Sequence, residues 1–498
     1  MSNFRQVFDS VLDKIDGIVW GLPTIILIFA TGILLTIRLR GLQFTKLGRA
    51  FKSIFSENGS DSGEVSKFGA LVTALSATIG TGNIVGVATA IVGGGPGALV
   101  WMWVAALLGI ATKYTECMLS VKYREIKSDG TVLGGPFYTI EKGMGPKWKW
   151  LAVLFAIFGM LVGLLGIGTM TQVNGITAAV NNAFDPSSKH IIFSIFGKDI
   201  TYATFISGLL VTIFAALVII GGLKRISKVA SVIVPFMAII YVFLGLSVLF
   251  MNATKIPAAF SLIFRSAFGY KAIGFGTMGY VLKQVTDSMQ KGVARGIFSN
   301  EAGLGSAPIA AASAKVEEPV EQGIVSMLGT FIDTIVICTM TGLAIVIAFY
   351  GDIEQAQGTV DAAGNFVATW NNGLEGAALS SEAFSRVLGG DGKSVQFLLM
   401  ICLVFFAFTT ILGWDYYSER CAEYLTHGNK AFVMVFRVLY IAAVFIGPYM
   451  TISEVWTIAD IVNALMAIPN CISLIALSGV ASRETKAYFQ NQKALKAS

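Results

Sequence analysis

Glycines and polar residues stand at the centre of an otherwise apolar stretch, residues 68–92. The string Gly80-Thr81-Gly82-Asn83 follows closely after Thr78 there. A glycine inside a helix costs about 1 kcal/mol relative to alanine, and unwound backbone is stable in a bilayer only where it faces protein or a cavity. The freed N–H and C=O groups of such a break can bind a polar solute or an ion. Close helix packing through small residues is the alternative, but it requires neither Asn83 nor the threonines, so we predict a discontinuous helix.

A second apolar stretch, residues 293–314, is interrupted in a similar way. Its interruption consists of polar residues, glycines and a proline: Ser299, Asn300, Glu301, Gly303, Gly305 and Pro308. Two interrupted helices in corresponding positions of two halves are typical of inverted-repeat transporters. We therefore predict a first five-helix repeat at 68–251 and a second at 293–481, with the span at 18–37 outside both. An odd number of helices per repeat gives the two copies opposite orientations.

Two further groups of polar residues lie at mid-membrane depth. Gln172, in the stretch 150–181, could bind the ammonium or carboxylate of a solute, or form a hydrogen bond between helices. Thr409 and Thr410 offer two hydroxyl oxygens. Sodium is a hard cation that prefers oxygen ligands, although threonines in membrane helices also bond to their own turn. Trp414, one turn after Thr410, could wall a small apolar pocket or simply pack.

Ionisable side chains are rare within the apolar stretches. Glu301 and Asp333 lie deepest, whereas Glu116 has Lys113 one helical turn away, so we expect that pair to interact. Both histidines lie in connectors. Because proton pumps and exchangers usually rely on chains of intramembrane carboxylates or histidines, this pattern favours sodium over protons as the coupling ion.

The composition argues against a soluble enzyme and against a nucleic-acid-binding protein. The 498 residues are 55% hydrophobic and only 13% charged, whereas a soluble domain carries about 25% charged residues. The net charge of +6 comes from Lys and Arg in short connectors, where they act as topology signals. No nucleophile–base pair lies at one depth, and the five cysteines form no CxxC pair. We therefore predict neither an enzyme nor a zinc site, and no nucleic-acid partner.

Eleven apolar stretches are long enough to cross a bilayer, which takes about 20 residues each. They are centred on 18–37, 68–92, 97–121, 150–181, 202–222, 228–251, 293–314, 321–350, 394–426, 430–448 and 453–481. Segments 134–145 and 256–290 are short, glycine-rich or broken by charges, and we interpret them as interfacial or re-entrant. The alternative is ten or twelve helices, depending on segment 256–290.

The basic residues predict the orientation of the chain. Lys and Arg concentrate in the connectors of one side and in the C-terminal tail, which the positive-inside rule places in the cytoplasm. The acidic connector 351–392 falls on the outside, whereas segment 252–295 brings basic residues there and fits least well. We predict an N-terminus outside, a C-terminus inside and a single membrane domain, residues 1–498.

Residues 93–109, GGGPGALVWMWVAALLG, resemble the signature of the alanine or glycine:cation symporter family, the sodium:alanine symporters. The family favours Phe where Val100 stands. The strings SATIGTGNIVGVA and FSNEAGLGSAP are similar to its two broken helices, and TTILGW is similar to a third landmark. The resemblance covers almost the whole chain. It implies an all-α, leucine-transporter-type fold with two inverted five-helix repeats and one additional helix, in agreement with the eleven spans.

The resemblance also implies roles for particular residues. The N–H groups near Gly80 and Gly82 would bind the substrate carboxylate. The implied substrate-binding residues are Thr78, Gly80, Thr81, Gly82, Asn83, Gln172, Ser299, Asn300, Thr410 and Trp414. The implied sodium ligands are the carbonyls around Ala77 and Ile79 and the hydroxyls of Thr409 and Thr410.

We expect sodium-driven uptake of small neutral amino acids, alanine or glycine, by alternating access, with sodium as the co-transported ion. The expected setting is the lipid bilayer of a bacterial inner membrane, where the protein acts as a monomer. A proton-coupled carrier of the same fold, using Glu301 or Asp333, is the alternative. A channel would need rings of like residues from several subunits, which eleven unequal spans do not favour.

Overall fold

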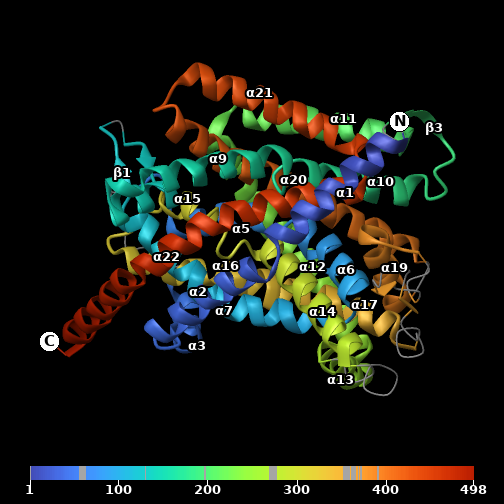
Figure 1. Cartoon of the computed structure of the whole chain (residues 1–498), viewed down its shortest axis with the longest axis horizontal. Helices are drawn as coiled ribbons and strands as arrows, with labels where there is room; N and C mark the ends of the chain where they lie inside the picture. The colour runs from blue at the N-terminus through green and yellow to red at the C-terminus, as the bar shows by residue number, and fades with distance from the viewer. Residues whose placement is uncertain are drawn as a thin grey trace.

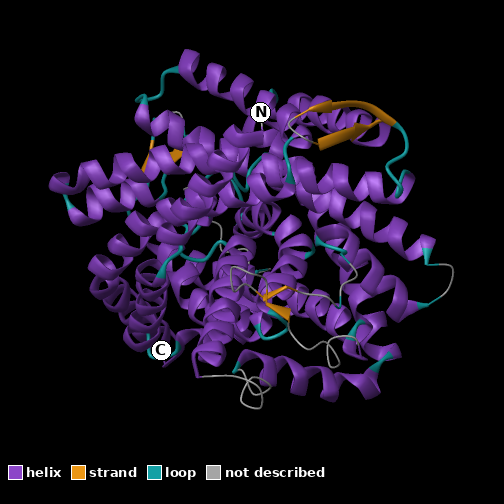
Figure 2. Ribbon diagram, turned by 45° about the vertical axis from the view of Figure 1, so that its right-hand side comes forward, coloured by secondary structure: helices purple, strands orange, loops and turns teal. Residues whose placement is uncertain are grey.

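Helices form almost all of the protein, in one bundle (Figure 1, Figure 2). The computed structural model describes residues 2–54, 63–128, 130–195, 198–268, 278–351, 359–360, 366–367, 370, 373–389 and 392–497. In this described part, strands occur as three short antiparallel pairs. They are β1 (Glu125–Ile126) with β2 (Val132–Leu133), β3 (Ile191–Ile195) with β4 (Lys198–Thr201), and β5 (Thr359–Val360) with β6 (Phe366–Val367). The prediction of an all-α protein is confirmed.

Nine stretches of the described residues are long and apolar enough to cross a membrane. Their main helices are α2 (Leu22–Arg38), α7 (Ala98–Lys122), α9 (Lys149–Leu165) with α10 (Met170–Phe184), α11 (Tyr202–Ile219), α12 (Gly222–Met251), α16 (Pro319–Thr330) with α17 (Thr339–Ala348), α20 (Lys393–Leu425), α21 (Lys430–Ile446) and α22 (Ile452–Ala497). Nine of the eleven predicted spans correspond to these stretches. The other two, 68–92 and 293–314, are interrupted and therefore lack one long helix.

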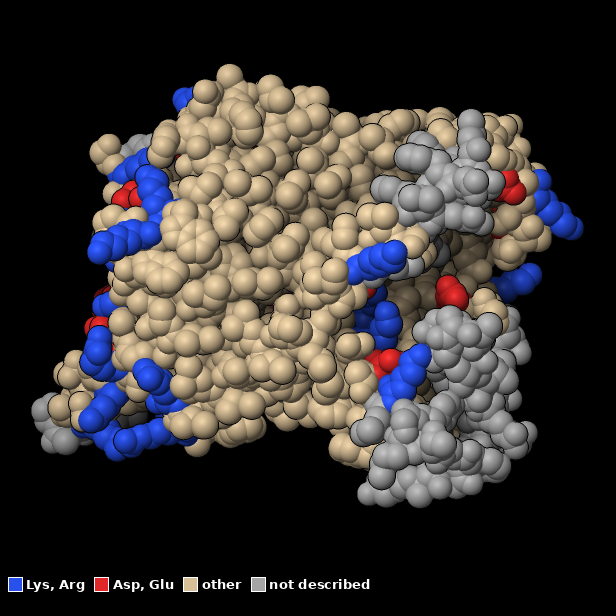
Figure 3. All heavy atoms as spheres, viewed as in Figure 1, with Lys and Arg blue, Asp and Glu red and all other residues tan. Residues whose placement is uncertain are grey.

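The outer surface of the bundle is the kind that a bilayer covers. Phe214 on α11, Phe243 on α12 and Val438 on α21 are 55%, 69% and 61% exposed. Figure 3 shows a broad face without charges, with Lys and Arg gathered toward its left and right edges. A water-soluble protein seldom exposes so large an apolar surface. The protein is therefore a multi-pass membrane protein.

Two predicted spans are less regular than expected. Span 150–181 consists of two helices, α9 and α10, with residues 166–169 between them. Span 321–350 holds the π-helix η6 (Phe331–Cys338) between α16 and α17. The sequence analysis treated each span as one regular helix, and π-helical turns depend on tertiary contacts rather than on a local pattern. Both irregularities lie beside the interrupted helices.

Segment 256–290 is not one interfacial piece. It contains α13 (Ile256–Ala267) and the first part of α14 (Met278–Asn300), while residues 269–277 lie outside the described residues. The second interrupted helix thus begins at 278, and the predicted start at 293 is wrong. Lys283, Asp287 and Lys291 lowered the apparent hydropathy there. Their spacing of four places them on one face of α14, so these charged residues do not interrupt the helix.

The remaining helical elements of the described residues lie between these spans or before the first of them. They are α1 (Ser2–Val19), α3 (Leu42–Thr45), α4 (Leu47–Ser53), α8 (Pro136–Tyr138), the π-helix η2 (Thr139–Met144), η3 (Pro146–Trp148), η4 (Ala253–Lys255), α19 (Gly376–Leu388) and η7 (Gly447–Tyr449). The acidic connector 351–392 is not only a loop, because α19 buries Phe384 fully. Four acidic residues of this connector, Asp352, Glu354, Asp361 and Asp391, lie outside the described residues.

The first interrupted helix lies at the centre of the bundle. It consists of α5 (Lys67–Thr78), the 3-10 turn η1 (Thr81–Asn83) and α6 (Val85–Gly94). Although η1 has only three residues, it contacts α10, α14, α20 and η6. The second interrupted helix, α14 followed by α15 (Ala307–Ala311), packs against α5, α6 and α7. The two breaks therefore share one interior.

Candidate functional site

The first break separates α5 from α6 as the glycine–asparagine string predicted. The α-helix ends at Thr78, and Ile79 has extended backbone dihedrals. The Gly80 N–H donates to Asn83 Oδ1 at 2.9 Å, and the Thr81 N–H donates to Gln172 Oε1 at 3.0 Å. Two freed backbone donors are thus satisfied by side-chain amides in a buried setting, where an unpaired donor would cost about 1–3 kcal/mol.

Gly80 allows three polar groups to meet at the break. A Cβ atom at this position would lie 2.5 Å from Thr410 Oγ1 and 2.9 Å from Gln172 Oε1. Both distances are shorter than real Cβ contacts, so only glycine lets α10 and α20 approach the break this closely. The residue combines an unwound backbone with close approach of two polar side chains.

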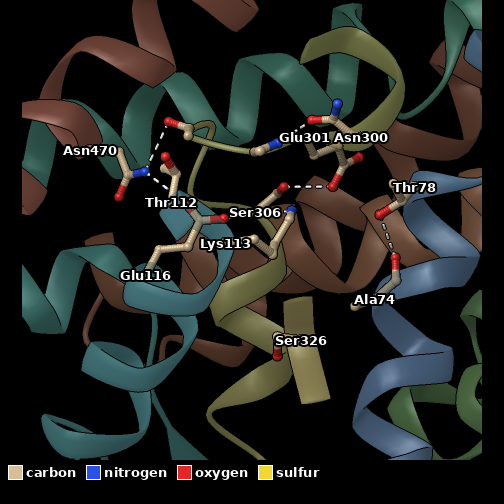
Figure 4. A network of polar contacts seen from close by, with 12 residues as sticks. Ala74, Thr78, Thr112, Lys113, Glu116, Asn300, Glu301, Ser306, Ser326 and Asn470 are labelled. Atoms are coloured by element: carbon tan, nitrogen blue, oxygen red, sulfur yellow. Dashed lines mark hydrogen bonds and ion pairs between the residues drawn. The ribbon is translucent and has the colours of Figure 1, made fainter. Parts of the chain in front are cut away.

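The second break begins at Glu301, directly after α14. Glu301 has a φ of +56°, and Gly303 and Gly305 have φ values of +89° and +81°, which residues other than glycine rarely adopt. The Glu301 carboxylate accepts from Ser306 Oγ and from Trp414 Nε1, each at 2.6 Å. Figure 4 shows Glu301 facing Ser306 across this turn. The carboxylate thereby connects the second break to α20.

Asn300 keeps the end of α14 in place. Its Oδ1 accepts from the Ala302 N–H at 2.9 Å, and its Nδ2 donates to Thr334 Oγ1 at 2.9 Å. Its side chain is therefore engaged with the break and with η6 rather than with the first interrupted helix.

Asp333 joins the two breaks, and sequence reasoning gave it no place in the substrate or sodium site. Asn83 Nδ2 donates to Asp333 Oδ1 at 2.6 Å, and Ser299 Oγ donates to Asp333 Oδ2 at 2.8 Å. A Cβ on Gly82 would lie 2.9 Å from Ser299 Cα, so the two backbones touch. The signal in the sequence was the depth of Asp333, which suggested only a proton carrier.

Thr410 brings an oxygen from α20 to the end of α5. Its Oγ1 lies 3.2 Å from the Ser76 carbonyl, 3.3 Å from the Ile79 carbonyl and 3.0 Å from the Phe406 carbonyl. A hydroxyl carries a single hydrogen, so it can donate to only one of these oxygens at a time. Four oxygens from two helices therefore gather at one point.

The structure does not bring Thr409 and Thr78 to that point. Thr409 Oγ1 lies against the carbonyls of Phe405 and Phe406 in its own helix. The Thr78 hydroxyl donates to the Ala74 carbonyl at 2.7 Å, also within its own helix (Figure 4). Ala77 instead packs against α20, where a Cβ on Gly413 would come within 2.7 Å of the Ala77 Cβ.

Gln172 reaches the site because α9 and α10 are separated. The Tyr440 hydroxyl lies 2.9 Å from the carbonyl of Gly168, which is between α9 and α10, and 2.7 Å from the carbonyl of Ile411 on α20. It can donate to either of these two oxygens. Trp414 is fully buried beside this separation, because a Cβ on Gly168 would lie 2.8 Å from the Trp414 Cβ. The run of glycines before Gln172 was the signal for this third irregularity.

A buried ion pair joins α14 to α22 near the second break. Arg295 on α14 binds Asp460 on α22 through two hydrogen bonds of 2.8 and 2.7 Å. The Arg295 guanidinium lies 4.5 Å from the centroid of the Trp456 ring, which packs at a tilt against Phe298, the neighbour of Ser299. The side chains of Arg295 and Asp460 are only 9% and 7% exposed, so the ion pair is buried.

A polar cleft of about 380 Å³ lies at another edge of the bundle. Its lining combines acidic, basic and aromatic side chains, including Glu141, Arg420 and Tyr424. Phe137 also lines it, and Pro136, the residue before Phe137, would lie 2.8 Å from a Cβ on Gly305. The cleft and the second break thus both lie against α8.

These features define a class of protein. Two helices interrupted at mid-length, with their breaks in contact inside a helical membrane bundle, are typical of secondary transporters. Among the described residues, no group of three or more His, Cys, Asp or Glu could hold a metal ion. The chain belongs to the sodium:alanine symporter family, whose model matches residues 5–498. The family consists of transporters and not of enzymes.

Two related sequences and one solved structure are similar to this chain over most of its length. An uncharacterized transporter of Haemophilus influenzae is 47% identical over 489 residues, with 98% of each chain covered. The sodium/alanine symporter AgcS of Methanococcus maripaludis is 44% identical over 490 residues, again with 98% of each chain covered. The crystal structure of MhsT in complex with L-phenylalanine is similar in fold, with a TM-score of 0.56 and 13% identity over 86% of this chain and 99% of that one.

Proposed function

We propose that this protein couples the entry of sodium to the uptake of small neutral amino acids such as alanine and glycine. The observation that carries the proposal is the gathering of Thr410 Oγ1 with the Ser76 and Ile79 carbonyls, at 3.2 and 3.3 Å. Neutral hydroxyl and carbonyl oxygens suit weak, reversible binding of a hard cation. Because they come from α5 and α20, a sodium ion there would hold the two helices together.

The amino acid would bind beside this ion, at the first break. The Thr81 hydroxyl is buried and has no hydrogen-bond partner among the described residues. The N–H groups of Gly80 and Thr81 face amide oxygens that a substrate carboxylate can replace, since hydrogen bonds to a charged acceptor are about twice as strong as neutral ones. Trp414 and Gln172 would limit the side chain, with about 1–3 kcal/mol of discrimination for each extra methylene.

Alternating access follows from the arrangement of the two sides. In the proposed cycle, sodium binds first and orders the first break, which raises the affinity for the amino acid. The coupling is reciprocal, so the amino acid tightens sodium binding by the same factor. The Arg295–Asp460 pair closes the outer side, and the inner side then opens toward the cleft beside Phe137.

The same proposal includes a topology. The nine long spans and the two interrupted helices together make eleven crossings, with the N-terminus outside and the C-terminus inside. The two repeats begin at the interrupted helices, and the second begins with α14 at residue 278. The protein forms one transport domain, acts as a monomer and lies in a bacterial inner membrane.

Uptake of radiolabelled alanine and glycine into proteoliposomes tests the function. An inward sodium gradient should drive accumulation, and an equal potassium gradient should not. A proton-coupled carrier is the second candidate, because Asp333 and Glu301 are fully buried carboxylates at the breaks. An inward proton gradient that drives accumulation without sodium would establish it and overturn the sodium proposal.

A further inference from the structure

A fully buried amide group on α22 has no partner for either of its ends among the described residues. It belongs to Asn463, which is 1% exposed and whose Oδ1 and Nδ2 atoms both lack a hydrogen bond within that part of the chain. Asn470, equally buried on the same helix, donates to Glu116 Oε2 at 3.0 Å and to the Gly303 carbonyl at 2.9 Å (Figure 4). Buried amides are nearly always hydrogen-bonded, so an exception calls for an explanation.

Helical spacing places Asn463 on the face of α22 that meets the second interrupted helix. Trp456 and Asn470 stand seven residues to either side of it, and a spacing of seven returns to the same side of a helix. The Trp456 ring lies 4.5 Å from the Phe298 ring between centroids, and Asn470 binds the carbonyl of Gly303. The end of α14 falls between these two contacts in the sequence, so Asn463 is level with the start of the second break.

Two other parts of the proposed pocket adjoin α22 beside this residue. A Cβ on Gly166, the first residue after α9, would lie 2.9 Å from Cγ2 of Val462, which directly precedes Asn463. A Cβ on Gly86, in the first turn of α6, would lie 3.7 Å from Trp456 Cη2. Around Asn463, α22 thus contacts both interrupted helices and the junction before α10.

The surrounding helix ends favour a cation at this place. The last carbonyls of a helix have no partners within it, and its C-terminal end carries partial negative charge. The 23-residue α14 ends here, whereas the proposed carboxylate partners are the N–H groups of Gly80 and Thr81. An amino acid held there by its carboxylate carries an ammonium group that needs oxygen acceptors. An amide oxygen is such an acceptor, with two lone pairs.

We propose that Asn463 binds the ammonium group of the transported amino acid through its Oδ1 atom. The inference rests on the proposed function and gives the substrate ammonium a partner on α22, a helix outside the set of predicted site residues. It also explains the unpartnered amide, because a group kept for a ligand lowers the stability of the protein until the ligand binds. Functional sites commonly carry such a cost.

Equilibrium binding of radiolabelled alanine to the purified protein, in the presence of sodium, tests the role. Asn463→Leu has a similar branched shape without polar atoms and should raise the Kd for alanine about 10- to 150-fold, the loss expected for one hydrogen bond to a charged group. It should melt no lower than the unchanged protein, because it removes a buried group that has no partner. The matched control Asn470→Leu should melt lower, since it takes a donor from Glu116 and Gly303. An unchanged Kd in Asn463→Leu, or a melting temperature lowered as far as in the control, would overturn the proposal.

N-methylalanine, which carries an extra methyl group on its nitrogen, tests the choice of the ammonium. Asn463→Ala removes the amide and leaves space beside that nitrogen, so the ratio of the Kd for N-methylalanine to the Kd for alanine should fall about tenfold or more, the discrimination that a pocket makes for one methylene. An unchanged ratio would mean that Asn463 does not face the ammonium, and the inference fails. Alanine binding that depends on Asn463, without sodium-driven uptake by the unchanged protein, would instead refute the proposed function alone.

Discussion

Replacement of Gly80 by alanine is the substitution whose effect the geometry defines best. The new Cβ would lie 2.5 Å from Thr410 Oγ1 and 2.9 Å from Gln172 Oε1. Neither neighbour can swing away freely, because Thr410 is held by carbonyl contacts of 3.0 to 3.3 Å and Gln172 accepts from the Thr81 N–H. The clash must therefore be relieved by movement of α10 or α20 away from the break.

The expected magnitude follows from overpacking. An extra methyl group in a well-packed interior costs about 1–3 kcal/mol. If this cost falls on the conformation that binds ion and substrate, it corresponds to a loss of about 5- to 150-fold in the ratio of maximal uptake rate to KM. Both the KM for alanine and the sodium concentration for half-maximal uptake should rise, because Gln172 and Thr410 belong to the two adjoining sites.

The assay is the initial rate of alanine uptake into proteoliposomes over a range of alanine and sodium concentrations. Gly329→Ala is the matched control, since Gly329 is buried in α16 and a Cβ there meets no atom within 4 Å. That variant should transport normally and should be at least as stable, because alanine favours a helix by about 1 kcal/mol over glycine. A Gly80→Ala protein with unchanged KM and unchanged sodium dependence would refute the close approach at the break.

Two further predictions concern the edges of the site. Arg295→Met leaves Asp460 buried without its partner and should destabilise the protein by about 3–5 kcal/mol. The added change Asp460→Leu should restore much of the lost melting temperature. A double variant that melts no higher than Arg295→Met would argue against a buried ion pair. In the cleft, burial alone would raise the pKa of Glu141, but the Tyr424 hydroxyl and the Lys149 ammonium bring this pKa below its usual value. The stabilisation that ionised Glu141 gives should therefore be present above about pH 4.5 and disappear as the pH falls through its lowered folded-state pKa. The difference in melting temperature between Glu141→Gln and the unchanged protein should vanish in acid. A difference that persists there would contradict this assignment.

Local sequence patterns were sufficient to predict the first helix break and one buried ion pair. The break at residues 80–83 was predicted because glycines and asparagine conflict with an apolar helix, and the pairing of Lys113 with Glu116 followed from helical spacing. Both are confirmed, the ion pair with Nζ and Oε1 3.5 Å apart. The start of α14 was missed because its charged residues share one face, a pattern that a hydropathy window averages away.

Other features depend on contacts that no local pattern reveals. Thr409 and Thr410 are chemically identical neighbours, and only the rotation of α20 decides which hydroxyl meets the first break. The role of Asp333 as a bridge between Asn83 and Ser299 depends on the π-helix η6. Tertiary packing determines both, so the residue types were found but their partners were not.

The central claim is tested most directly by a sodium titration of alanine binding to three purified proteins: the unchanged chain, Thr410→Val and Thr409→Val. Loss of one oxygen ligand, worth about 1–1.5 kcal/mol, should raise the half-saturating sodium concentration of Thr410→Val roughly 5- to 13-fold. Thr409→Val should titrate like the unchanged protein, because its hydroxyl contacts only its own helix and the Met237 sulfur. An unchanged sodium titration in Thr410→Val, or an equal rise in both variants, would contradict an ion site between α5 and α20.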